Sequence, residues 1–158
     1  MKYTEAKVTF AEIPTEINLC LSISNCDGRC ANCHSPELRE NIGADVEENI
    51  LAEIDKHPNI TCVCFLGEGK KNPNYVNEYK RIVKLIRDNY PNLRLAIYGG
   101  SPKVQNEWME LFDYIKVGPY EEDLGPLTSL TTNQRLYRVV NKTFLEDITY
   151  MFHYKGAK

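Results

Sequence analysis

Three closely spaced cysteines are the residues of this chain whose types and spacing most clearly allow chemistry. Cys26, Cys30 and Cys33 form a C-x3-C-x2-C array, and His34 directly follows the last thiol. Thiolates bind soft or borderline metals, and a short spacing lets one loop supply several ligands at a small cost of loop closure. The array therefore predicts a metal centre held by the loop 25–34.

Two kinds of metal centre fit these ligands. A zinc ion bound by the three thiolates and His34 would be a closed structural site. A cubane iron–sulfur cluster held by three thiolates would leave its fourth iron open for a small ligand. Zinc modules usually place their ligands in two pairs far apart in sequence, so the compact array favours the cluster, with unmetallated thiols as a third alternative.

The other three cysteines, Cys20, Cys62 and Cys64, lie in apolar segments that look like strands. Free cysteine is among the most buried residue types, so we expect these three to fill the core. The chain begins without the continuous apolar stretch of a signal peptide, which argues against a secreted disulfide framework. The sequence therefore indicates one functional cysteine group.

Alternation of apolar and polar residues over 17–24 predicts a strand that leads into the cysteine loop. Asp45, with Glu48 three residues later, predicts the start of a helix. Further elements follow in a strand–helix order that is typical of parallel crossovers. The expected strands are 7–10, 17–24, 60–69, 93–100, 113–119 and a weaker one at 136–141, and the expected helices are 45–57, 73–89 and 102–111.

These elements predict an α/β fold, a partial TIM-type barrel of parallel strands with crossover helices. A complete eight-stranded barrel needs about 250 residues, and the chain has 158. We expect one domain over residues 1–158, with a less regular segment from about 120 to 158. The loop after the first strand of such a repeat is where these folds place their active sites.

Composition excludes several classes of function. A formal net charge of −3 gives no bulk attraction to nucleic acid or to an anionic membrane. The sequence has no run of about 18 apolar residues, so we expect no membrane span. The predicted location is the cytoplasm.

Several segments together resemble one known family. The cysteine spacing matches the signature of the radical S-adenosylmethionine (radical SAM) enzymes. CANCHSPEL, FLGEG, VGPYEEDLGPL and TTNQRLYRV then resemble the activating enzymes of anaerobic (class III) ribonucleotide reductases. The resemblance extends from about Thr9 to Tyr150. The cysteine motif is specific for the superfamily, and the later segments are specific for the family.

The resemblance implies an oxidoreductase that activates a glycyl-radical enzyme. Cys26, Cys30 and Cys33 would ligate a 4Fe-4S cluster whose open iron binds S-adenosyl-L-methionine (SAM). Reductive cleavage of SAM would give a 5′-deoxyadenosyl radical that takes a hydrogen from a glycine of the larger reductase. The implied partners are this reductase and an electron donor such as flavodoxin or ferredoxin. Two alternatives remain, an activating enzyme of the formate-lyase type and a zinc-stapled binding module without catalysis.

The resemblance also implies a set of SAM contacts. The family usually has Gly-Gly-Glu or Gly-Gly-Asp after the second strand, whereas this chain has Gly67-Glu68-Gly69, which displaces the carboxylate by one position. A slip of one residue turns a side chain to the other face of a strand, so the loop is expected to contact SAM without the usual ion pair of Glu68. The remaining expected contacts are Asn32 against the adenine, His34 near the cluster or SAM, Gly99 through its backbone, and Lys116 either on the SAM carboxylate or in a structural salt bridge.

Two polar segments lie in the last third of the chain, at 121–123 and 133–135. Glu121, Glu122 and Asp123 are expected to form a solvated acidic turn. Asn133, Gln134 and Arg135 carry a strong part of the resemblance, and two roles stay open for them. They would either fix the C-terminal segment by hydrogen bonds or face the reductase.

Overall fold

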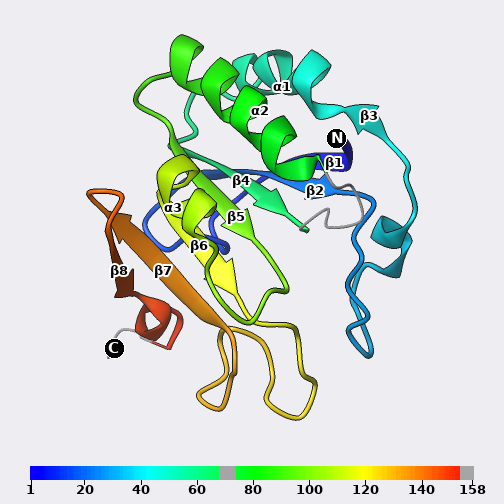
Figure 1. The fold of residues 1–158 in the computed structure, drawn as a ribbon, viewed down its shortest axis with the longest axis vertical. Helices are drawn as coiled ribbons and strands as arrows, with labels where there is room; N and C mark the ends of the chain where they lie inside the picture. The colour runs from blue at the N-terminus through cyan, green and yellow to red at the C-terminus, as the bar shows by residue number, and fades with distance from the viewer. Residues whose placement is uncertain (68–73, 154–158) are drawn as a thin grey trace.

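The structure, a computed structural model, describes residues 1–67 and 74–153 and forms one eight-stranded sheet with its helices on one side (Figure 1). The strand order is β3-β1-β2-β4-β5-β6-β7-β8. The strands are β1 (Lys2–Thr9), β2 (Asn18–Ile23), β3 (Ala44–Asp45), β4 (Cys62–Leu66), β5 (Arg94–Tyr98), β6 (Tyr114–Val117), β7 (Arg135–Val140) and β8 (Phe144–Asp147).

The expected partial TIM-type barrel is wrong, because the sheet is mixed and open. Among the described strands, β2, β4, β5 and β6 pair in parallel, but the other four of the seven pairings are antiparallel. On one side β1 forms a hairpin with β2, and on the other β7 returns against β6 without a crossover helix. Antiparallel neighbours need only a turn or loop, whereas each further parallel strand needs a crossover. The antiparallel strands β1 and β7, which flank the four parallel strands, therefore end the parallel repeat before it can curve into a barrel.

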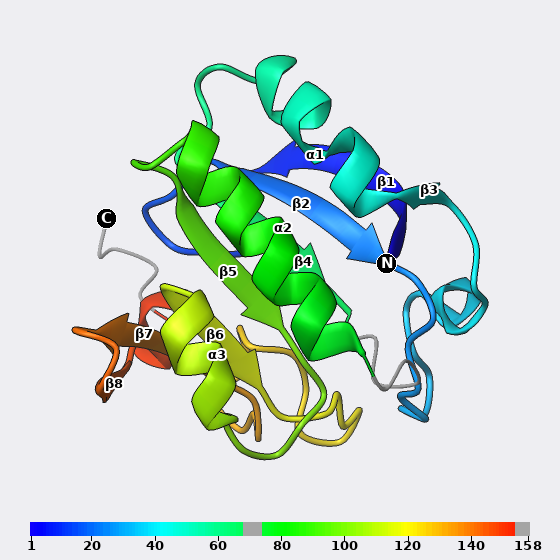
Figure 2. The same cartoon turned by 45° about the horizontal axis from the view of Figure 1, so that its top comes forward.

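Three short helices cover one face of the sheet (Figure 2). They are α1 (Val46–Asp55), α2 (Tyr75–Asn89) and α3 (Asn106–Leu111). The helix α1 begins as expected, because the side chain of Asp45 accepts a hydrogen bond of 3.1 Å from the Glu48 backbone N–H. The apolar sides of the helices contribute residues such as Ile50, Ile82 and Trp108 to the main core.

The opposite face of the sheet is covered by irregular chain and by the short 3-10 helix Thr149–Phe152 instead of α-helices. There a second apolar cluster contains Cys20, Cys62 and Cys64 together with Ile13 from the β1–β2 connection and Ile148 near the C-terminal end. Each of the three cysteines is at most 4% exposed, which confirms that they fill the core. Since β4 alternates between the two clusters, it is buried on both faces, as its apolar run predicted.

Most element positions agree with the expectations, but two strands had no signal. The edge strand β3 has only two residues, and β8 has the partly polar sequence FLED. Conversely, β1 begins at Lys2, five residues before the expected strand 7–10. Its early part gave no two-residue pattern, because Thr4 and Glu5 are both exposed and the register shifts between Tyr3 and Ala6. The start of the expected helix 73–89 and the end of the expected strand 60–69 fall partly outside the described residues.

Within the ranges 1–67 and 74–153, no helix has the length and apolar character that a membrane crossing requires.

Candidate functional site

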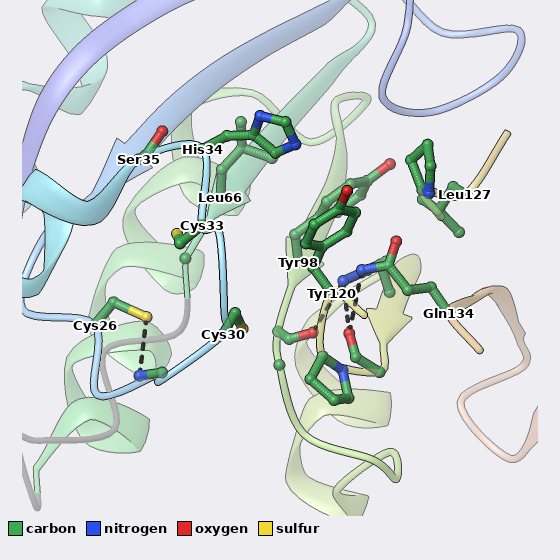
Figure 3. A pocket seen from close by; sticks show the side chains of 18 of the residues that line it. Cys26, Cys30, Cys33, His34, Ser35, Leu66, Tyr98, Tyr120, Leu127 and Gln134 are labelled. Atoms are coloured by element: carbon green, nitrogen blue, oxygen red, sulfur yellow. Dashed lines mark hydrogen bonds between the residues drawn. The ribbon is translucent and has the colours of Figure 1, made fainter. Parts of the chain in front are cut away.

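A cavity of about 730 Å³ lies where the parallel strands end (Figure 3). It is lined by residues at or just after the carboxyl ends of three strands, including Leu66 and Gly67 after β4, Tyr98 and Gly99 after β5, and Gly118 after β6. Ligand sites of open α/β sheets form at this end of the strands, and this volume suits a small organic ligand. The cysteine loop that follows β2 closes one side of the cavity.

Local hydrogen bonds hold the cysteine loop. The backbone N–H groups of Asn25 and Cys26 donate to the carbonyls of Glu40 and Leu38, each at 2.9 Å. The guanidinium of Arg39 donates to the carbonyl of Cys30 at 3.1 Å. These bonds tie the start and the middle of the loop to the short 3-10 helix Pro36–Arg39 and to Glu40 directly after it. The segment that follows the loop thus helps to hold it in place.

All three cysteines of the array line the cavity. Figure 3 shows their side chains on one side of it, opposite Tyr98, Tyr120 and Gln134. A Cβ added at Gly28 would lie 3.2 Å from the Cys26 sulfur and 3.9 Å from the Cys30 sulfur, so the backbone at Gly28 comes close to both sulfurs. A side chain at this position would crowd the Cys26 sulfur. Three thiols on one wall of a cavity are the number of protein ligands that leaves one iron of a cubane cluster open, so the donor set fits such a cluster.

The electrostatics of the Cys26 thiol reflect two opposing influences. Burial raises the pKa of Cys26 above its ordinary value, whereas the Gly28 backbone N–H, which donates to the sulfur at 3.4 Å, lowers it. A backbone donor aimed at a sulfur stabilises the thiolate form that binds metal. The loop therefore contains one of the sulfur hydrogen bonds that tune iron–sulfur sites.

His34 also lines the cavity, but its ring packs against another ring. The His34 and Tyr120 ring centroids are 5.3 Å apart with the planes tilted by 59°. In the part of the chain that the structure covers, no group of three or more His, Cys, Asp or Glu side chains is arranged to hold a single metal ion. The expected role of His34 beside the cluster or SAM stays a prediction.

The predicted glycine contacts lie at the cavity. Gly67 has φ +94°, and a Cβ there would come within 2.8 Å of the Ile23 carbonyl oxygen, so β4 and the end of β2 approach each other closely at this point. Gly99, at the end of β5, lines the same cavity. Glu68 and Gly69 lie outside the described residues, so their predicted SAM contacts stay predictions.

Lys116 is a buried cation at the cavity. Its side chain belongs to β6, the residue is 8% exposed, and its Nζ donates to the Gly118 carbonyl at 2.8 Å. The same nitrogen lies 5.9 Å from the centroid of the Tyr98 ring, within the range of a cation–π contact. A positive charge held next to the cavity can bind a carboxylate. The expected contact of Lys116 with the SAM carboxylate stays a prediction.

Asn32 lies in the cysteine loop with its backbone at φ +52°, and it is not among the described residues that line the cavity. Its side-chain amide donates to the carboxylate of Glu122. This contact joins the cysteine loop to the segment after β6. The expected contact of Asn32 with the adenine of SAM stays a prediction.

Several cavity residues had no signal in the sequence. Tyr98 donates its hydroxyl hydrogen to the Glu12 backbone carbonyl, which brings the β1–β2 connection to the cavity wall. Burial raises the pKa of the Glu12 carboxyl, although the charges of Lys7 and Lys116 act in the opposite direction. Glu12 comes to the site from an irregular segment, so only the tertiary structure reveals it.

The segment 133–135 fixes the chain by hydrogen bonds, one of the two roles left open for it. The Asn133 amide donates to the Pro119 carbonyl at 2.9 Å and to Glu121 at 3.0 Å. Gln134 is 6% exposed, lines the cavity and donates to the Gly118 carbonyl at 3.4 Å. Arg135 donates to the Thr132 carbonyl at 2.8 Å. These bonds close the long connection between β6 and β7.

Comparison of the chain with protein-family models, with curated proteins and with solved structures found no match. The function is therefore argued from the motifs and from the geometry of the cavity.

Proposed function

We propose that this protein is a radical SAM activating enzyme that generates a glycyl radical on an anaerobic ribonucleotide reductase. The observation that carries the proposal is the placement of Cys26, Cys30 and Cys33 along one wall of a cavity at the carboxyl ends of parallel strands. Three thiols are the ligands that leave one iron of a 4Fe-4S cluster open. The remaining cavity has the size of a small-molecule site.

When bound, the cluster and SAM would supply one-electron cleavage of SAM and abstraction of a hydrogen atom from glycine. The residues of this chain would bind, orient and shield these groups. Cys26, Cys30 and Cys33 would hold the cluster as thiolates, and the Gly28 N–H, which donates to the Cys26 sulfur, would stabilise that thiolate.

Two charged groups suit the amino-acid part of SAM. The Lys116 ammonium is held by a backbone carbonyl at the cavity and would attract a carboxylate. Glu12 lines the same cavity and would attract an ammonium group. The backbone at Gly67 and Gly99 carries no side chain, which lets a ligand approach the strand ends closely. We assign the protein to the cytoplasm, because thiols that bind a cluster must stay reduced.

Iron analysis and SAM cleavage test the proposal together. After anaerobic reconstitution with iron and sulfide, the protein is expected to hold about four irons per chain and to cleave SAM with a strong reductant. Cys30→Ala should abolish cleavage. Cys62→Ala, which removes a thiol buried in the second core cluster, is the matched control and should retain it. Full cleavage by Cys30→Ala, or one zinc per chain without sulfide, would contradict the proposal.

A further inference from the structure

The connection between β6 and β7 has two sides with different surroundings. We call residues 119–132 the mouth loop. Its inner side lines the cavity through Tyr120, Pro126 and Leu127. On its outer side Leu130 is 85% exposed, more than any other exposed large apolar residue of the described chain. In Figure 1 this loop extends beyond the sheet, below the end of β6. An apolar side chain thus stands in solvent next to the opening of the site.

Hydrogen bonds within the mouth loop fix the residues around Leu130. The Thr131 hydroxyl donates to the Leu124 carbonyl at 2.8 Å, and the Thr132 hydroxyl donates to the Gly125 carbonyl at 3.2 Å. The Ser129 N–H donates to the Pro126 carbonyl at 2.8 Å. Because the loop is already ordered, binding of a partner at Leu130 would cost little conformational entropy, which favours binding.

Three carboxylates adjoin this apolar side chain along the chain. Glu121, Glu122 and Asp123 are exposed members of the mouth loop, and none of them forms an ion pair with a cation at a described position. Unpaired charges of one sign on a surface steer a partner of the opposite sign and fix its register. The mouth loop therefore presents an exposed apolar side chain together with carboxylates that have no ion-pair partner at a described position, a combination that a basic polypeptide with an apolar pocket would complement.

We infer that the mouth loop is the docking surface for the protein substrate, a segment of the reductase that carries basic residues and an apolar pocket for Leu130. This inference rests on the proposed function, because that function requires a protein to reach the cavity. The acidic turn would attract the basic residues and Leu130 would fill the pocket. The inner side of the same loop would then lead the glycine-bearing segment of the partner to the cysteine wall.

Binding to a purified anaerobic ribonucleotide reductase, measured anaerobically by biolayer interferometry at low and high salt, tests this inference. Leu130→Ser should weaken binding by about fivefold or more, as expected for an anchor residue. Phe144→Ser is the matched control, because Phe144 is 62% exposed at the far end of the β7–β8 hairpin. It should change the affinity less than about twofold.

A charge test uses Glu121→Lys/Asp123→Lys against Glu107→Lys/Glu110→Lys, which makes the same change of charge on the exposed side of α3. The first pair should weaken binding by about tenfold at low salt and less at high salt, and the second pair should bind as the parent protein does. Equal effects of the two pairs, or unchanged affinity of Leu130→Ser, would overturn the docking assignment.

SAM cleavage with a chemical reductant and without the reductase separates this inference from the proposed function. Leu130→Ser and Glu121→Lys/Asp123→Lys should cleave SAM at the parent rate, because Leu130, Glu121 and Asp123 lie outside the cavity lining. If cleavage is intact in all proteins but the docking variants bind normally, only the inference fails. If the parent protein does not cleave SAM, or does not bind the reductase, the proposed function fails and the inference with it.

Discussion

Gly67→Ala is the substitution whose effect the structure predicts most sharply. Gly67 follows β4 and forms part of the cavity wall. Its φ of +94° is a backbone conformation that residues with a Cβ rarely adopt. A Cβ at this position would also lie 2.8 Å from the Ile23 carbonyl oxygen, a backbone atom at the end of β2 that cannot rotate away.

The two effects add to a sizeable loss of stability. The unfavourable φ costs about 1–2 kcal/mol, and the shift of backbone needed to relieve the contact adds about 1–2 kcal/mol. We therefore expect Gly67→Ala to lower the free energy of unfolding by about 2–4 kcal/mol, a large share of the stability of an ordinary domain. Because the shift would displace the cavity wall, SAM affinity should fall as well.

Gly100→Ala is the matched control for this prediction. Gly100 also lines the cavity, but no atom lies within 4 Å of the position that its Cβ would take. Urea unfolding of the three proteins, followed anaerobically by circular dichroism, should show a change of no more than about 0.5 kcal/mol for Gly100→Ala. Equal stability of Gly67→Ala and the parent protein would refute the close approach of β4 and β2 at Gly67.

Two further predictions concern the scaffold. Burial and the 2.9 Å hydrogen bond to Glu53 raise the pKa of Tyr3 to about 12, so the unfolded chain loses this proton first and stability should fall as the pH rises from about 10 to about 12. In urea unfolding at several pH values, the free energy of unfolding of Tyr3→Phe should fall by about 2 kcal/mol less than that of the parent protein over this pH range. The same pH profile for both proteins would contradict the role given to Tyr3. Asp45→Ala should cost about 1 kcal/mol through loss of the α1 cap. The exposed Asp88→Ala should cost less than about 0.5 kcal/mol, and equal melting temperatures of the two variants would argue against the cap.

The sequence predicted the elements of the chain better than their pairing. Local periodicity identified β2, β4, β5 and β6 and the helices between them, because each of these segments carries its own apolar pattern. The open sheet depends instead on how the chain returns after β6, which the hydrogen bonds of Asn133 and Gln134 fix over a long connection. Such contacts between distant segments leave no periodic signal, so the barrel prediction extended a parallel repeat that in fact stops.

The same distinction applies to the site. The three thiols and the glycines at strand ends follow directly from the sequence, since each lies next to an element with a clear pattern. Glu12 lines the cavity from the β1–β2 connection, which accepts a hydrogen bond from Tyr98 over 86 positions of sequence. Asn32 has a left-handed backbone conformation and a side-chain bond to Glu122, and it is not among the described residues that line the cavity. Neither the long-range contact nor the turn conformation could be read from local residue types.

Electron paramagnetic resonance of the reductase is the most direct test of the central claim. The reconstituted protein, SAM, a strong reductant and a purified anaerobic ribonucleotide reductase should together give the doublet signal of a glycyl radical on the reductase. Omission of SAM, or use of Cys30→Ala, should remove that signal. A reductase that stays silent while the added protein holds its full complement of iron and cleaves SAM would contradict the account.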